Sequence, residues 1–297
     1  MRREKGSQLK KRTRKQRLGA ALFLSPSLIG VFLFFVLPFF VVIYYSMINN
    51  PILGEFVWFE NFGNVLRNAA FKIAGKNTLK FSFIAMPLSV ILGLLLALLL
   101  DRNIPLRSQF RTCFLTPMMV PVASVVLIFQ VMFHLNGAVN RFMVNFGADK
   151  VDWLKSDQAQ IVIIILFLWK NLGYNMILFL AALESIPKDL LEVATLENAN
   201  AWQIFFHIKI RYLTSTILFV TIFSLINSFK VFREIYLLTG NYPYDSLYML
   251  QHYMNNTFKS LDYQKLSAAA IIMSLVMVVI IGALFLVENY FGKDVEE

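Results

Sequence analysis

The chain has 297 residues, of which 58% are hydrophobic and only 15% are charged, and its formal charge at neutral pH is +10. Soluble domains are about 45–50% apolar and about 25% charged, so this composition excludes an ordinary soluble domain. The mean hydropathy of +0.61 indicates an integral membrane protein.

A basic tail begins the chain, because nine of the 28 lysine and arginine residues lie within residues 1–17. Positive charge directly before an apolar stretch is typical of a cytoplasmic anchor that faces anionic lipid. Nucleic-acid binding is disfavoured, since no aromatic residue interleaves these charges. A cleaved signal peptide is disfavoured too, because the apolar run from Leu22 to about Tyr45 exceeds the roughly 7–15 residues of a signal core.

Six apolar segments are long enough to cross a hydrocarbon core of about 30 Å, which takes about 20 residues. These predicted spans are Leu22–Ser46, Thr78–Leu100, Thr112–His134, Ala159–Leu183, Tyr212–Leu238 and Leu266–Val287. Five prolines lie in the first three, at positions 26, 38, 87, 117 and 121, where neighbouring helices can satisfy the freed carbonyl groups. The single cysteine, Cys113, is expected to be a small core residue of the third span.

The segments between the spans are too short to form a second hydrophobic core. We therefore expect four regions: a basic cytoplasmic tail (1–21), the first transmembrane helix with its outer loop (22–77), a core transmembrane domain (78–288) and a cytoplasmic tail (289–297). With the amino terminus inside, the inner segments hold sixteen lysine and arginine residues and the outer segments seven. Without the tail the two sides tie, so the prediction of two cytoplasmic termini depends on the tail.

The sequence lacks the motifs that are typical of several kinds of enzyme and nucleotide-binding protein. No phosphate-binding loop motif occurs, and neither H-E-x-x-H nor G-x-S-x-G is present. The three histidines are far apart in sequence, which disfavours a metal site. Carboxylates are nearly absent from the middle of the spans, where ion-coupled transporters usually keep them. We predict no catalytic and no metal-binding residue, and energy for any transport is expected from another protein.

Residues 184–211, between the fourth and fifth spans, predict a helix–turn–helix. Pro187 can occupy the first position of the first helix, and acidic residues in its early turns interact favourably with the helix dipole. Asn198-Ala-Asn200 breaks it, and the second helix has a strongly apolar side. Four carboxylates outnumber Lys188 on the polar face, at Glu184, Asp189, Glu192 and Glu197. A connector that rests on lipid usually carries lysine and arginine there, so a basic protein partner fits better.

This segment resembles the EAA coupling loop in permease subunits of binding-protein-dependent ABC importers. The matching positions are Glu192-Val-Ala194, Ala199, Trp202-Gln203, Phe205, Ile208 and Ile210. Asn198 stands where the family has glycine, and asparagine readily adopts the left-handed conformation that ends a helix. Arg211 stands where the family has proline, so we expect the fifth span to begin earlier here.

The resemblance covers most of the chain and is specific to the sugar branch, the relatives of the maltose and glycerol-phosphate permeases. The other matching segments are Trp58–Phe62, Asn77-Thr78, Phe229–Gly240 and Asp262–Ala270. The resemblance implies an all-α integral membrane fold of about six transmembrane helices, with the type I ABC importer permease architecture. It also implies location in a prokaryotic cell membrane.

The resemblance further implies the partners: a second permease subunit, giving a heterodimer, two cytoplasmic ATP-binding subunits and an extracytoplasmic solute-binding protein that delivers a sugar or oligosaccharide. ATP and Mg would be bound by the partner ATPase, and this chain would hold no cofactor. The coupling residues implied are Glu192, Ala194, Glu197, Asn198 and Ala199. Among them, Glu192 matches the carboxylate that pairs with a basic group of the ATPase.

Polar residues in the fourth and fifth spans are the candidates for the substrate pathway: Asn171, Tyr174, Asn175, Ser224, Asn227 and Ser228. Relatives of the maltose permease line their sugar site with the fourth span, and the last three residues share one helix face. Amides and hydroxyls with a tyrosine suit the hydroxyl groups of a sugar. The alternative is that these residues join helices by hydrogen bonds, as is common in membranes.

Three cations lie in or at the edges of spans, at Lys170, Lys230 and Arg233. Charges there are costly and usually functional. We favour pairing with Glu234 and acidic loop residues, or extension to the outer interface. Otherwise they would suit an anionic substrate, such as glycerol phosphate or an acidic oligosaccharide. A stand-alone channel and a membrane-bound enzyme are the rival classes of protein.

Overall fold

The computed structural model describes residues 19–102 and 104–292. Within them the chain is helical, with one isolated β-bridge between Ile48 and Phe56. Most of the predicted basic tail and the last five residues of the predicted carboxyl-terminal tail lie outside the described residues. The chain forms two compact units, one of residues up to Val65 with Asp262–Ile272, the other of Leu66–Leu261 with the residues from Met273 onward.

The first unit contains a continuous helix over Gly19–Ser46, which includes η1 (Phe32–Val36) and α2 (Leu37–Ser46). Most of α3 (Glu60–Arg67) and the start of α14 (Tyr263–Gly292) complete it. The side-chain amide of Asn61 on α3 donates to the carbonyl oxygens of Ser46 and Ile48, at 3.0 and 2.8 Å. These two bonds fasten α3 to the end of the first helix.

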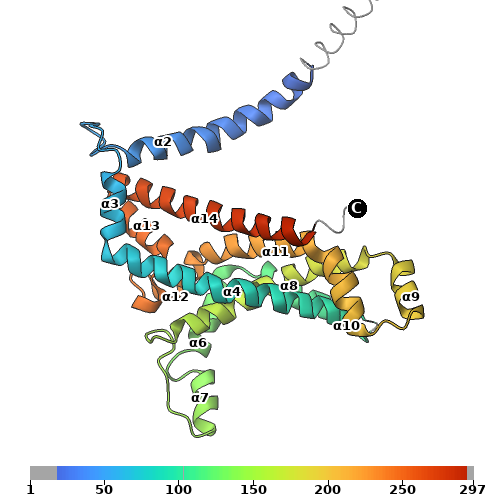
Figure 1. The fold of residues 1–297 in the computed structure, drawn as a ribbon. Coiled ribbons are helices and arrows are strands. Elements are labelled where there is room, and N and C mark those ends of the chain that lie inside the picture. Colours follow the sequence, from blue (N-terminus) through green and yellow to red (C-terminus); the bar gives the residue numbers. More distant parts are fainter. Residues whose placement is uncertain (1–18, 103, 293–297) are drawn as a thin grey trace, which may run out of the picture. The chain divides into compact units, whose positions relative to one another are not determined.

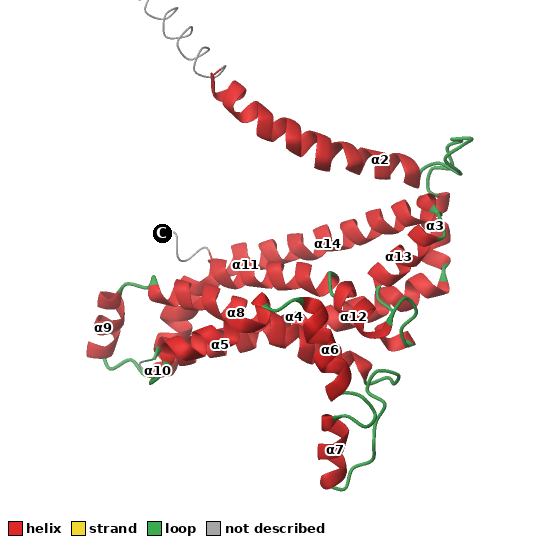
Figure 2. Ribbon diagram, turned by 180° about the vertical axis from the view of Figure 1, so that it is seen from behind, coloured by secondary structure: helices red, strands yellow, loops and turns green. Residues whose placement is uncertain are grey.

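The second unit contains the remaining helices and the end of α14 (Figure 1). They are α4 (Ala69–Asp101), α5 (Arg107–Met119), α6 (Val122–Met132), α7 (Ala138–Asn145), α8 (Ala159–Glu184), α9 (Lys188–Leu196), α10 (Ala201–Gln203), η2 (Ile204–Lys209), α11 (Ile210–Phe229), α12 (Phe232–Thr239), η3 (Asp245–Leu247) and α13 (Leu250–Lys259). Helices α4, α8 and α11 lie side by side (Figures 1 and 2). They form the centre of this unit.

Two buried apolar clusters hold these helices together. One joins α4, α8 and α11 around Met176 and Phe179, and the other joins α4, α6, α8 and α12 around Phe81 and Ile163. At Gly93 on α4, an added Cβ would lie 2.8 Å from the Cβ of Asn175 on α8. A small residue therefore lets these two helices approach closely, as small residues commonly do in membrane bundles.

In the described part of the chain, five helices are long and apolar enough to cross a membrane, and a sixth span results if the bent pair α5–α6 counts as one. This confirms the prediction of about six transmembrane helices. The boundaries differ from those predicted: α4 begins at Ala69 rather than Thr78, because Asn68 caps it by accepting bonds from the backbone N–H groups of Ala70 and Phe71. Helix runs without a break from Ala201 to Phe229, which confirms the earlier start of the fifth span in the absence of a proline at Arg211.

The third predicted span, Thr112–His134, is not one straight helix, because α5 and α6 meet at an angle of 98°. The break lies at Val120, whose ψ of 132° is extended, directly before Pro121. A proline disfavours helical geometry in the residue that precedes it and lacks the N–H of the helical ladder. Pro87 and Pro117 lie inside unbroken helices. The prediction of Cys113 as a core residue is wrong, since its side chain is exposed.

The segment before α13 is fastened to α4 by hydrogen bonds. The Asn77 amide donates to the carbonyl oxygens of Asp245 and Tyr248, at 2.6 and 3.1 Å. The Thr78 hydroxyl accepts from the backbone N–H of Leu250 at 2.9 Å. Next to it, burial lowers the pKa of His252 to about 4, so this imidazole is uncharged at neutral pH.

Candidate functional site

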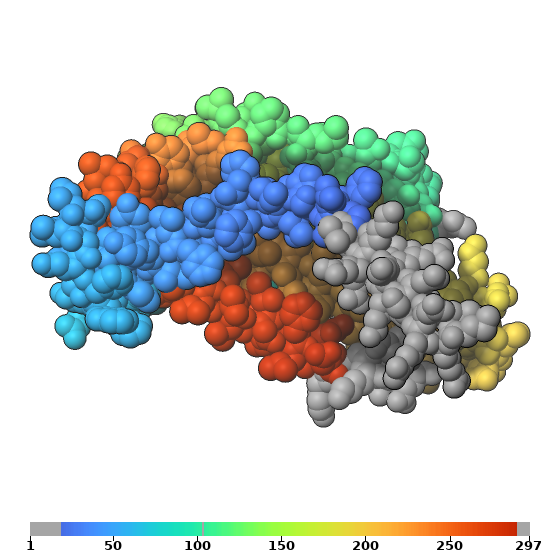
Figure 3. All heavy atoms as spheres, turned by 90° about the horizontal axis from the view of Figure 1, so that it is seen from above, coloured from blue at the N-terminus to red at the C-terminus, as the bar shows by residue number. Residues whose placement is uncertain are grey.

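Two regions of the second unit carry the candidate residues: the 184–211 loop and a cavity along α8 and α11. The loop, with α9, lies at the opposite end of this unit from α13 (Figures 1 and 3).

The loop begins at an ion-pair cluster. Glu184, the last residue of α8, accepts hydrogen bonds at one carboxylate oxygen from Arg107 and Arg111 of α5, each at 2.7 Å. The two arginines are four positions apart and therefore share one face of α5. Glu184 is one of the four carboxylates predicted to suit a basic partner; its side chain is 48% exposed, and two arginines of the same chain bind it.

The first helix of the loop, α9, ends in a hydrogen-bonded turn. Pro187 precedes this helix instead of opening it. Asn198 has a φ of +60°, which confirms its predicted left-handed conformation. The N–H of Ala199 donates to the carbonyl of Ala194 at 2.9 Å, and that of Asn198 to Thr195 at 3.0 Å. This is the Schellman pattern of bonds, which satisfies the free carbonyls at a helix end.

The second helix of the loop begins with a reciprocal cap. The Asn200 side chain accepts from the N–H of Gln203 at 2.9 Å, and the Gln203 side chain accepts from the N–H of Asn200 at 2.8 Å. Helix then continues through α10, η2 and α11. On η2, Lys209 binds Asp101, the last residue of α4, at 2.7 Å. The loop is thus joined to α5 at its start and to α4 at its end.

The surface of the loop is both acidic and apolar. Glu192, Glu197 and Asn198 are exposed, and Ala194 and Ala199 are half-buried. Large apolar side chains are exposed as well: Leu196 is 81% and Trp202 71% accessible, and the Trp202 ring stacks on that of Phe206. An exposed apolar surface with acidic groups is typical of a protein-binding site. The five predicted coupling residues lie together on this helix and turn.

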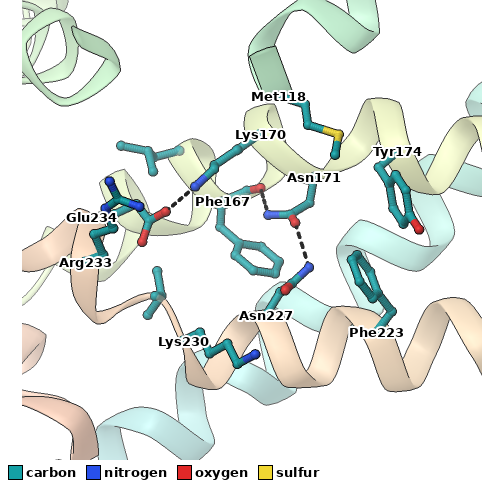
Figure 4. Close-up of a pocket in the computed structure, with 12 residues that line it drawn as sticks. Met118, Phe167, Lys170, Asn171, Tyr174, Phe223, Asn227, Lys230, Arg233 and Glu234 are labelled. Atoms are coloured by element: carbon teal, nitrogen blue, oxygen red, sulfur yellow. Dashed lines mark hydrogen bonds and ion pairs between the residues drawn. The ribbon is translucent and has the colours of Figure 1, made fainter. Parts of the chain in front are cut away.

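The cavity has a volume of about 340 Å³, within the usual range for ligand sites. It lies along α8, the end of α11 and the start of α12, with one residue from α5 (Figure 4). Its lining is Met118, Leu166, Phe167, Lys170, Asn171, Tyr174, Phe223, Asn227, Lys230, Val231, Arg233 and Glu234. Lys230 and Val231 form the junction at which α11 ends and α12 begins.

A pair of amide side chains and a pair of aromatic rings form part of the cavity wall. The Asn171 amide donates to the carbonyl of Phe167 at 2.8 Å, and the Asn227 amide donates to the Asn171 oxygen at 3.2 Å (Figure 4). The rings of Tyr174 and Phe223 lie 4.7 Å apart between centroids. The wall therefore presents amides beside an aromatic pair.

The charged residues of the wall are only partly paired. Lys170 and Glu234 form an ion pair across the cavity between α8 and α12. This confirms the predicted pairing with Glu234 for one of the three cations. Lys230 and Arg233 also line the cavity and are exposed.

Three of the six predicted pathway residues line the cavity, namely Asn171, Tyr174 and Asn227. The other three, Asn175, Ser224 and Ser228, do not line it, and their side chains are buried.

Those three residues join helices, which was the alternative role considered for them. The Asn175 amide donates to the hydroxyls of Ser89 and Ser224, at 2.7 and 3.0 Å. The Ser228 hydroxyl donates to that of Ser82 at 2.7 Å. These bonds tie α4, α8 and α11 together in a medium where interhelical polar contacts replace the hydrophobic effect.

Sequence reasoning missed several of the contacts that build these regions. Met118 reaches the cavity from α5, and Phe223 pairs with Tyr174. Spacing offered a signal for Phe223, which precedes Asn227 by one helical turn, but none for Met118. The Asp101–Lys209 pair joins residues 108 positions apart, and no local pattern predicts such a contact.

Comparison with known proteins gives one family. The profile of the family described as binding-protein-dependent transport system inner membrane component matches residues 89–297. The lactose transport system permease protein LacF of Rhizobium radiobacter is 30% identical, over 92% of this chain and 93% of its own. The sulfoquinovosyl glycerol transport system permease protein SmoG of Agrobacterium fabrum is 30% identical, over 86% of each chain.

A further relative is the probable starch degradation products transport system permease protein AmyD of Thermoanaerobacterium thermosulfurigenes, 28% identical over 87% of this chain and 90% of its own. Among solved structures, a chain of a bacterial ABC transporter involved in the import of the acidic polysaccharide alginate aligns with a TM-score of 0.80. That alignment covers 98% of this chain and 100% of the other, at 23% identity. The likeness confirms the predicted all-α permease fold.

Proposed function

The chain belongs to the family of binding-protein-dependent transport system inner membrane components, and we propose that it imports a sugar or oligosaccharide as one permease subunit of an ATP-driven ABC transporter. Relatives named for lactose and for starch degradation products support a saccharide substrate. The chain is a multi-pass membrane protein without a phosphate-binding loop motif, so ATP and Mg are bound by partner ATPase subunits.

The observation that carries this proposal is the 184–211 loop. Glu192 is exposed on a short helix that ends in a hydrogen-bonded turn, and ion pairs hold the segments on both sides of this helix. An exposed carboxylate on a rigid, projecting element suits a basic cleft on another protein better than it suits an anionic membrane surface. The five coupling residues bind in such a basic cleft on an ATPase subunit.

The geometry supports a direct transfer of motion. Closure of the ATPase dimer displaces α9. Because the Schellman turn and the Asn200–Gln203 cap hold the loop rigid, the loop moves as a unit and does not deform. The ion pairs of Glu184 with Arg107 and Arg111 transmit this displacement to α5, and the Lys209–Asp101 pair transmits it to α4. The buried hydrogen bonds of Asn175 and Ser228 link α4 to α8 and α11, which line the cavity.

The remaining partners follow from the same proposal. A second permease subunit completes the pore, and an extracytoplasmic solute-binding protein delivers the saccharide. The complex lies in a prokaryotic inner membrane with both termini of this chain in the cytoplasm, the basic tail faces anionic lipid, and no step involves nucleic acid.

The test reverses the charge of the docking residue. In the reconstituted importer with its ATPase and binding protein, Glu192→Lys is expected to reduce binding-protein-stimulated ATP hydrolysis at least tenfold, because a buried contact between unlike charges becomes one between like charges. Membrane insertion, measured by the yield of intact chain in the membrane fraction, is expected to stay unchanged. Glu60→Lys makes the same reversal at an exposed position of the first unit and serves as the matched control.

Wild-type ATPase stimulation in Glu192→Lys would refute the docking role of this residue. Solute uptake into vesicles without ATP would instead favour a stand-alone channel.

A further inference from the structure

One ion pair forms part of the cavity wall. The ammonium group of Lys170 on α8 donates to Oε1 of Glu234 on α12, and both residues line the cavity. The Glu234 side chain is only 10% exposed, and that of Lys170 is 29% exposed. The contact joins two helices and gives the two charged groups one common position at the cavity.

Each member of this pair can make further hydrogen bonds. An ammonium group has three N–H donors, and a carboxylate has two acceptor oxygens. In the described part of the chain, Nζ of Lys170 makes one hydrogen bond, and Glu234 accepts through Oε1 alone. The other donors of Lys170 and Oε2 of Glu234 lie in a largely enclosed site, where polar groups need partners. A ligand in the cavity can supply these partners.

Two neighbouring hydroxyl groups fit the remaining donors and acceptor. A hydroxyl group both donates and accepts, so one hydroxyl can donate to Oε2 of Glu234 while the next accepts from Nζ of Lys170. The two charges of the pair compensate each other, and a charged ligand would have to separate them, which is costly for a buried ion pair. Uncharged hydroxyl groups can bind without breaking the pair.

The rest of the wall suits the same kind of ligand. Asn171 directly follows Lys170 in the sequence, and its side chain accepts from the amide of Asn227. Figure 4 shows this amide pair between the ion pair at one end of the cavity and the rings of Tyr174 and Phe223 at the other. Amides offer donors and acceptors to further hydroxyl groups, and the rings offer an apolar face.

We propose that the Lys170–Glu234 pair binds two neighbouring hydroxyl groups of an uncharged saccharide and thereby selects the substrate. The proposal rests on the proposed function and names the recognition group and the substrate class of the same site. A pair that only joined α8 to α12 would make no contact with the ligand. The two roles differ in one measurable respect: only a recognition group makes the effect of a variant depend on which hydroxyl groups the ligand carries.

The experiment measures ATP-driven uptake by the complete importer, with its second permease, ATPase and binding protein, in vesicles. The saccharides are lactose, maltose, maltotriose, raffinose and arabinotriose. The KM of the best substrate is compared with those of its monodeoxy analogues, each of which lacks one hydroxyl group. Two analogues that lack neighbouring hydroxyl groups are expected to have a KM at least tenfold higher, because each leaves one member of the ion pair without its ligand bond.

The variant Lys170→Met with Glu234→Leu removes both charges and leaves no lone buried charge. It is expected to raise the KM of the parent saccharide at least tenfold and to transport the two critical analogues as well as the parent. The binding protein is the same in all vesicles, so its own preference cancels in this comparison. The matched control is Asp262→Asn with Lys265→Met, which removes the charges of an ion pair that does not line the cavity. Its ranking of analogues is expected to stay that of the wild type.

A second variant exchanges the two residues, as Lys170→Glu with Glu234→Lys, and keeps the ion pair between α8 and α12. Its yield in the membrane fraction is expected to equal that of the wild type. The KM of the parent saccharide is expected to rise, and the analogues that lose affinity are expected to differ, because donor and acceptor have changed places. If the double apolar variant is not recovered from the membrane, the exchange variant decides.

Three results would overturn the proposal. The first is uptake of none of the five saccharides, because the paired charges call for uncharged hydroxyl groups. The second is a double apolar variant in which the parent and every analogue lose affinity by the same factor, as a pair that only joins helices would give. The third is an exchanged pair with the wild-type KM for every analogue. Failure of the proposed function is recognised separately, by unaltered ATPase stimulation in Glu192→Lys.

Discussion

At Gly173 the backbone of α8 touches the backbone of α5. A Cβ at this position would lie 1.9 Å from the carbonyl oxygen of Phe114, and no rotation of a side chain can relieve a contact with backbone. Met118 follows Phe114 by one helical turn and lines the cavity. Gly173 therefore sets how closely α5 approaches α8 at the cavity wall.

We predict that Gly173→Ala lowers the apparent melting temperature of the purified importer by roughly 5 °C, since overpacking costs about 1–3 kcal/mol. Uptake is expected to fall as α5 moves. Gly282→Ala on α14 is the control, because nothing lies within 4 Å of an added Cβ there and alanine favours a helix. Equal melting temperatures for the two variants would contradict the close contact.

The 184–211 loop behaves as an element held at both ends. Glu184 binds Arg107 and Arg111, and Lys209 binds Asp101. All five side chains are partly exposed, and pairs of this kind usually contribute no more than about 1 kcal/mol to stability. Their value in this fold is positional, because they join a projecting helix to two spans of the bundle.

We predict that Asp101→Lys and Lys209→Asp each lower the number of solute molecules imported per ATP hydrolysed, because each places like charges at the end of the loop. The double variant restores the pair in reverse and is expected to recover most of the loss, with a coupling energy of about 1 kcal/mol. Transport and ATP hydrolysis are measured in the same vesicles. A double variant as impaired as the worse single variant would show that the pair does not transmit motion.

At the scale of the whole molecule, the predicted orientation in the membrane depends on the basic tail. Sixteen inner and seven outer cations predict two cytoplasmic termini, and the two sides tie once residues 1–17 are left out of the count. The loop that carries Glu192 must face the cytoplasm for an ATPase to reach it. The proposed docking of the loop therefore requires the orientation that the tail predicts.

This orientation predicts a labelling pattern. The chain has one cysteine, so Cys113→Ser gives a background for Asp149→Cys and Glu197→Cys, both at exposed positions. In intact cells a membrane-impermeant maleimide is expected to label Asp149→Cys at once, but Glu197→Cys only after permeabilisation. Without residues 1–17, part of the chains are expected to insert in the opposite orientation, so that both cysteines are labelled in part in intact cells. Labelling of Glu197→Cys in intact cells with the tail present would refute the orientation.

The sequence by itself determined the features that arise from local composition and spacing. Span length and hydropathy are properties of single helices, and they predicted about six spans. Asn198 was predicted to adopt a left-handed conformation from its residue type at a helix end, and Arg211, in place of a proline, predicted an earlier start of the fifth span. These predictions were confirmed because backbone geometry at a turn depends mainly on the residues within it.

The tertiary structure alone decided which polar residues face a cavity and which face another helix. Asn171 and Asn175 are one turn apart on α8, yet the first lines the cavity and the second is buried against Ser89 and Ser224. Pro121 breaks its span, whereas Pro87 does not. For the two asparagines the outcome depends on contacts with segments far away in the chain. A sequence pattern specifies the face of a helix, and only packing specifies what that face meets.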